Sequence, residues 1–167
     1  MSAFIKLVFD VCLLKAGPED MPAQRPYLIL AAAFYSVVVL IVFSVTEWRL
    51  SPLLLTLQAM LSIALATGLI LHLAGHGSRL RQTLTALYAT SAMMSLVPLL
   101  MQPLINGDIV PSVVINAVIL IMFFWSFAID SHIFSRSLQV SMWIGLLISI
   151  VLFLFNQILL TPWQAPA

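Results

Sequence analysis

Residues 138–160 read LQVSMWIGLLISIVLFLFNQILL, and no charged side chain occurs among them or anywhere after them. A helix needs about 20 predominantly apolar residues to cross the hydrocarbon core of a bilayer. The stretch therefore predicts a membrane-spanning helix that ends close to the carboxyl terminus.

The same criterion predicts four further spans, because charged residues mark the positions that cannot lie in the hydrocarbon core. The five expected spans are 27–45, 52–73, 83–104, 109–129 and 138–160. Asp130 is expected to mark the end of the fourth span, followed by a short polar turn over 131–137. The loops between spans are short, so 27–160 forms one transmembrane domain.

Composition supports a membrane protein. The 167 residues are 62% hydrophobic and 8% charged, whereas soluble domains are about 45–50% apolar and about 25% charged. These values exclude a soluble enzyme and a disordered chain. A net charge of +1 provides no electrostatic footprint for nucleic acid. The expected fold class is all-α, a polytopic bundle of five transmembrane helices in contact with the lipid bilayer.

An amino-terminal segment precedes the first span. Residues 1–17 predict an amphipathic helix at the membrane interface, because Ser2, Lys6 and Asp10 share one stripe among apolar residues. Gly17 and Pro18 end it, and residues 18–26 form a linker. At the other end, 161–167 is expected to be a short outer tail.

Lysines and arginines predict the orientation, because cytoplasmic loops carry an excess of them. With the amino terminus in the cytoplasm, only Arg49 lies on the outer side. The carboxyl terminus is then outside. A bacterial inner membrane with a periplasmic carboxyl terminus is the expected location, and a eukaryotic secretory-pathway membrane remains the alternative.

Small residues at four-residue spacing form two ridges, on which helices can approach closely. One ridge consists of Ala64 and Gly68, and the other of Ser141, Gly145 and Ser149. They predict internal helix packing or the docking of a partner helix.

Neutral polar residues within the spans include Gln58, Asn116 and Asn156. They could line a pore, but hydrogen bonding between helices is the commoner use. Pro98 is expected to kink the third span. The span boundaries leave no acidic or basic side chain at mid-membrane depth, which disfavours a proton-coupled transporter.

Three histidines, His72, His76 and His132, are expected at the cytoplasmic face. They are candidate metal or haem ligands, but polar end-capping is the commoner role, so no metal and no cofactor is predicted. Cys12 is the only cysteine, which excludes an intrachain disulfide. No catalytic motif is present, and the chain is not expected to be an enzyme.

The stretch Gly75–Thr90, reading GHGSRLRQTLTALYAT, and the region Trp125–Leu160 resemble the Yip family of Rab-GTPase-interacting membrane proteins, in particular its bacterial branch. The family's five spans and its orientation agree with those deduced above. The acidic segment Asp-Leu-Tyr-Gly-Pro of the eukaryotic members has no counterpart here, so Rab binding does not carry over. The resemblance implies a non-enzymatic scaffold or trafficking-type membrane protein.

These features lead to three hypotheses. The first is a non-catalytic accessory, scaffold or assembly subunit that binds other membrane proteins. The second is a small-solute transporter or channel, formed as a homo-oligomer. The third is a redox subunit that uses the histidines.

Overall fold

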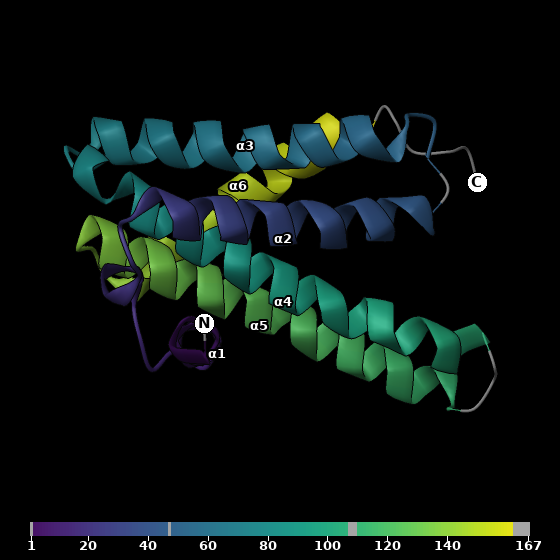
Figure 1. Cartoon of the computed structure of the whole chain (residues 1–167). Helices are drawn as coiled ribbons and strands as arrows, with labels where there is room; N and C mark the ends of the chain where they lie inside the picture. Colours follow the sequence, from purple (N-terminus) through teal and green to yellow (C-terminus); the bar gives the residue numbers. More distant parts are fainter. Residues whose placement is uncertain (1, 47, 107–109, 162–167) are drawn as a thin grey trace.

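The computed structural model describes residues 2–46, 48–106 and 110–161, and the regular structure in these ranges is helical (Figure 1). The α-helices are α1 (Ser2–Cys12), α2 (Arg25–Ser44), α3 (Pro52–Leu73), α4 (Leu80–Asn106), α5 (Ser112–Leu138) and α6 (Met142–Leu160). Two short 3₁₀ turns, η1 (Pro18–Asp20) and η2 (Gly77–Arg79), lie between them. The expected all-α class is confirmed.

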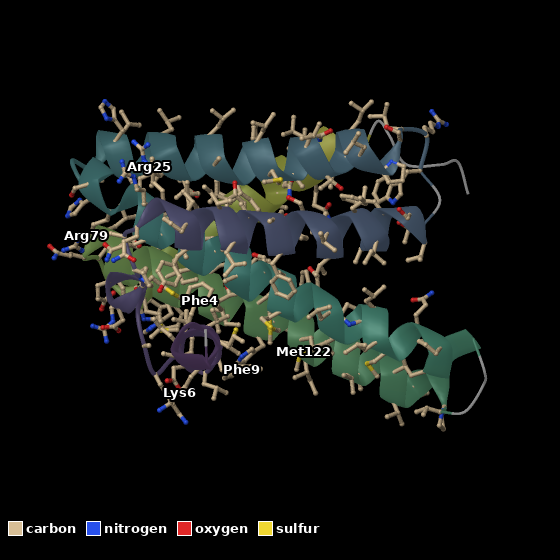
Figure 2. All side chains as sticks on the ribbon, viewed as in Figure 1. Phe4, Lys6, Phe9, Arg25, Arg79 and Met122 are labelled. Atoms are coloured by element: carbon tan, nitrogen blue, oxygen red, sulfur yellow. The ribbon has the colours of Figure 1, made fainter. Side chains whose placement is uncertain are left out.

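Helices α2 to α6 are each long and apolar enough to cross a membrane, which confirms a multi-pass membrane protein. Short connections make successive helices antiparallel. Helices α2 and α3 lie side by side, α4 pairs with α5, and α6 crosses behind α2 and α3 (Figure 1). Arg25 and Arg79 lie at one end of the bundle (Figure 2). This end, which also includes Arg136, is called the basic end below.

The fourth span differs from the expectation. Helix α5 does not stop at Ile129 but continues through the expected polar turn to Leu138. Ile133 and Phe134 are buried in the core, and the hydroxyl of Ser131 donates to the carbonyl oxygen of Met142 at 2.7 Å. Packing therefore keeps a polar segment helical, and α6 starts at Met142 rather than at residue 138. Residue 109, where the fourth span was expected to begin, lies outside the described residues.

The extension of α5 changes the place of Asp130. Asp130 lies eight residues before Leu138, so it is about 12 Å from the end of the helix at a rise of 1.5 Å per residue. Asp130 thus lies within α5, between Trp125 and His132, which contact the carbonyl oxygens of Cys12 and Ala16 in the amino-terminal segment. The expected end of the fourth span at Ile129 was wrong, and α5, one of the helices long and apolar enough to cross a membrane, contains the ionisable side chain of Asp130.

Helix α4 is longer than the expected span 83–104 and passes through Pro98 and Pro103 without ending. Each proline lacks a backbone N–H and leaves a carbonyl of the preceding turn unpaired within the helix. Neighbouring helices in a membrane bundle can compensate for such groups.

Helix α1 crosses the bundle and is seen end-on in Figure 1. Val8 and Val11 are buried against the bundle, while Ile5 and Phe9 on the other side are about half exposed. The side chain of Lys6 extends away from the bundle (Figure 2). Apolar residues lie on both sides of the helix, so it is not clearly amphipathic. It is also short, because it ends at Cys12. Both findings correct the expectation of an amphipathic helix over residues 1–17.

Polar contacts join the elements at the basic end. The guanidinium of Arg79 donates to the carbonyl oxygens of Arg136 (3.1 Å) and Ser137 (3.3 Å), which are unpaired groups at the end of α5. The amide of Gln82 donates to the carbonyl oxygens of Glu19 (3.2 Å) and Met21 (2.9 Å). The expected linker 18–26 is therefore anchored to α4.

Candidate functional site

Two cavities lie between the helices. The first, about 250 Å³, is bordered by residues of α2 to α6, and the second, about 340 Å³, lies between α4 and α5. Both cavities are lined by Ser91, Phe123, Ser126 and Asp130. The pair α4–α5 diverges from α2–α3 away from the basic end (Figure 1). We call the two cavities together the Asp130 site.

The carboxylate of Asp130 is the only acidic group that lines either cavity within the described residues. Its chain neighbours Ile129 and Ser131 are buried. Within the described residues, no lysine, arginine or histidine lines the two cavities, and Asp130 forms no ion pair there. Ionisable groups buried between membrane-spanning helices are costly and characteristically mark substrate or ion pathways.

Three serine hydroxyls on the first cavity already donate their hydrogen to a backbone carbonyl of their own helix. The bonds run from Ser62 to Ala59 (2.9 Å), from Ser126 to Phe123 (2.7 Å) and from Ser149 to Gly145 (2.9 Å). A hydroxyl has one hydrogen and two lone pairs. These serines can therefore act toward the cavity as hydrogen-bond acceptors.

Thr67 differs from these serines. Its side chain lines the first cavity and is fully buried, yet its hydroxyl has no hydrogen-bond partner within the described residues. An unpaired buried hydroxyl costs about 1–3 kcal/mol. The group is therefore available to a molecule inside the cavity.

Aromatic side chains form much of the wall of the first cavity. The ring centroid of Phe153 lies 5.4 Å from that of Phe123 and 5.3 Å from that of Phe127. Tyr35 lines the same cavity from α2, and its ring centroid is 5.2 Å from that of Tyr88. One carboxylate, several hydroxyls and an aromatic wall thus meet inside the bundle.

The small-residue ridges have different surroundings. A Cβ atom on Gly145 would overlap the backbone oxygen of Ser131, so the helices α5 and α6 approach closely there. Ser149 is buried beside the first cavity, whereas Ser141 is exposed just before α6. On α3, Ala64 packs against the core, and a Cβ on Gly68 would meet only Leu80 at 3.9 Å.

The three side-chain amides within the spans also differ in whether they line a cavity. Asn156 lines the first cavity, where its Oδ1 lies 3.4 Å from the hydroxyl oxygen of Ser62. Asn116 is exposed on α5 and Gln58 is half-buried on α3, and neither lines the two cavities. Of the three candidates, the structure brings only Asn156 to the Asp130 site.

The histidines are not brought together. His72 is exposed, a ring nitrogen of His76 lies 2.8 Å from the carbonyl oxygen of Ala74, and one of His132 lies 3.1 Å from that of Ala16. Among the described residues, no three histidine, cysteine, aspartate or glutamate side chains are grouped to hold a metal ion.

A periodic signal in the sequence could have revealed the site. Ser126, Asp130 and Phe134 are spaced four residues apart, so they share one face of a helix. All three line the first cavity. The expected polar turn after Asp130 concealed this pattern, because it ended the helix too early.

Comparisons with protein-family models, with curated proteins and with solved structures found no match to this chain. The resemblance to the Yip family stays an expectation from the sequence.

Proposed function

We propose that the chain is a small-solute transporter or channel that binds its solute at the Asp130 site. The observation that carries the proposal is a carboxylate that faces two cavities inside a membrane-spanning bundle, with no ion-pair partner in the described residues. Ionisable residues in such positions characteristically serve solute or ion pathways. Polar groups from four other helices line the same space, as expected of a binding site within a bundle.

The hypothesis of an accessory or scaffold subunit has less support than it had from the sequence. It depended on three features of the sequence: no buried charge, no catalytic constellation, and small-residue ridges on two helices. Asp130 removes the first argument, and the contact of Gly145 with Ser131 assigns part of one ridge to internal packing. Binding to other membrane proteins and the formation of a homo-oligomer stay predictions.

Transport can be tested in proteoliposomes with one cation, one neutral solute and one anion, namely choline, glycerol and acetate. We expect at least one of them to enter faster than in protein-free liposomes, and Asp130→Asn to slow this entry at least tenfold. Asp10→Asn makes the same chemical change on α1 and should leave entry unchanged. Asn116→Leu should also have no effect, because Asn116 lines neither cavity. If none of the three solutes enters above the background, the proposal of transport fails.

We further propose that the chain lies in a bacterial inner membrane with its amino terminus in the cytoplasm, because Arg49 is the one basic residue at the end opposite the basic end. Single cysteines at the exposed positions Ser78 and Ser51 test this in a Cys12→Ser background. A membrane-impermeant maleimide should label S51C in intact cells and S78C only after permeabilisation. The reverse pattern would overturn the proposed orientation.

A further inference from the structure

We infer that the Asp130 site binds a monovalent organic ammonium cation. This inference rests on the proposed function, because it names the class of solute that the same site takes. It is carried by the charge, the hydrogen-bonding character, the size and the wall chemistry of the cavities.

Charge determines the sign and valence of the ligand. Asp130 supplies one negative charge, and no basic side chain lines either cavity in the described part of the chain. An anion would meet an unscreened carboxylate in a medium of low dielectric constant, where like charges repel strongly. A monovalent cation neutralises the carboxylate, whereas a divalent cation would leave an uncompensated positive charge, which is costly to bury.

Three serine hydroxyls on the first cavity favour the same sign. Ser62, Ser126 and Ser149 use their hydrogens on backbone carbonyls, so they direct lone pairs toward a ligand. Thr67 adds an unpaired hydroxyl that can bond to a hydroxyl or amine of the ligand. Oxygen lone pairs around one carboxylate stabilise positive charge and repel negative charge.

Size and wall chemistry favour an organic cation over a metal ion. The first cavity measures about 250 Å³ and is partly open to the outside, because Phe123 and Phe155 in its wall are 39% and 48% exposed. It has room for a small organic molecule. Much of its wall consists of the side chains of Phe123, Phe127 and Phe153. Aromatic rings attract ammonium groups, whereas hard metal ions require a shell of oxygen ligands.

Binding of choline to the purified protein in detergent tests this inference by isothermal titration. The neutral probe 3,3-dimethyl-1-butanol has the shape of choline without its charge, and Na⁺ represents the metal-ion alternative. We expect the protein to bind choline at least tenfold more tightly than 3,3-dimethyl-1-butanol, and Na⁺ at up to 100 mM not to displace choline. Equal affinity for the two organic probes, no binding of choline, or displacement by Na⁺ would overturn the inference.

Substitutions at Asp130 test whether choline binds to this carboxylate. Asp130→Asn should weaken choline binding at least tenfold, and Asp130→Glu, which keeps the charge, should bind choline more tightly than Asp130→Asn. Asp10→Asn, which removes a carboxylate from α1, should stay within threefold of the unmodified protein. Unchanged affinity in Asp130→Asn would show that choline binds elsewhere and overturn the inference. If Asp130→Asn does not fold, the comparison of choline with its neutral isostere in the unmodified protein decides the question.

The binding experiment and the transport assay can give different outcomes, because the first measures binding and the second measures flux. Choline binding with no flux of any solute would refute transport and leave the ammonium site intact. Entry of glycerol without choline binding would support transport and refute the ammonium site.

Discussion

At the level of single residues, the hydroxyls in the bundle fall into two groups. Most of those on the described helices donate to a carbonyl three or four residues earlier, as Thr85 and Thr90 do on α4. This bond within the helix gives the buried hydroxyl an acceptor, so no partner from a neighbouring helix is needed. Thr67 is fully buried and forms no such bond within the described residues.

Replacing Thr67 tests this directly. Thr67→Val removes an unpaired hydroxyl while nearly keeping the shape, so it should stabilise the ligand-free protein by about 1 kcal/mol. The measurement is the denaturation temperature in detergent. Thr83→Val is the matched control, because the Thr83 hydroxyl lies 3.0 Å from the carbonyl oxygen of Arg79 and 2.8 Å from Oγ of Ser137. The control should lose about 1–3 kcal/mol. A loss of stability in Thr67→Val would contradict the assignment of an unpaired group.

The two glycines of the small-residue ridges give a second residue-level prediction. Gly145→Ala places a methyl group against the backbone of Ser131, which cannot move aside without shifting α5. The expected cost is about 1–3 kcal/mol. Gly68→Ala has free space and should gain up to about 1 kcal/mol from the higher helix propensity of alanine. Equal denaturation temperatures for the two variants would disprove the close contact between α5 and α6.

At the level of elements, the carboxyl end of α5 is held by another helix. Arg79 donates to two carbonyls there, and a cation at a helix carboxyl terminus also interacts favourably with the helix dipole. This contact joins η2 and the start of α4 to the segment that was expected to be a turn. It helps to explain why α5 extends beyond Asp130.

Arg79→Gln should lower stability by about 0.5–1 kcal/mol, because it removes the charged donor from both carbonyls. Hydrogen exchange should increase at the backbone amides of 134–138. Arg81→Gln removes the same charge at an exposed position two residues away and should change stability by less than about 0.5 kcal/mol. An equal loss of stability in the two variants would indicate that the lost positive charge is responsible. It would contradict a capping role of Arg79 at the end of α5.

Helix α1 is attached to α5, because Nε1 of Trp125 donates to the carbonyl oxygen of Cys12 at 3.0 Å. Burial raises the pKa of the Cys12 thiol from 9.0 to about 11. Only the thiolate reacts with maleimides, so the folded protein at pH 8 should react roughly a hundredfold more slowly than the unfolded chain. The rate in the folded protein should rise as the pH approaches 11. Equal rates at pH 8 would show that α1 does not pack as described.

At the level of the whole molecule, one end of the bundle is tightly connected and the other is more open. The basic end is held by bonds from Arg79 and Gln82, while the helix pairs α2–α3 and α4–α5 diverge toward the opposite end (Figure 1). The first cavity of the Asp130 site is bordered by both pairs, and the second lies between α4 and α5. A ligand bound there would contact several helices at once and should therefore stabilise the whole bundle.

Choline at 100 times its dissociation constant should stabilise the protein by about 2.7 kcal/mol, as expected when a ligand binds only the folded state. The measurement is the denaturation temperature as a function of choline concentration. Asp130→Asn should show no shift at the same concentrations. A shift of the same size in Asp130→Asn would indicate a nonspecific effect of the added salt.

The amino-acid sequence by itself determined that the protein is all-α and crosses the membrane several times. This information is local, because the length of an apolar run and the charges that interrupt it decide whether a helix can lie in lipid. The sequence also identified Gly145 and Asn156 as residues of interest. It misplaced the end of α5, because the polar residues 131–137 look like a turn until their burial is known.

Only the tertiary structure decided the surroundings of these residues. Whether Asp130 faces headgroups or a cavity depends on how α4 and α6 pack around α5 and on residues of α2 and α3, which are distant in the chain. The same dependence separates Asn156, which lines the first cavity, from Asn116, which is exposed on α5. Helical periodicity specifies which residues share a face, but the contacts between faces are set by nonlocal packing.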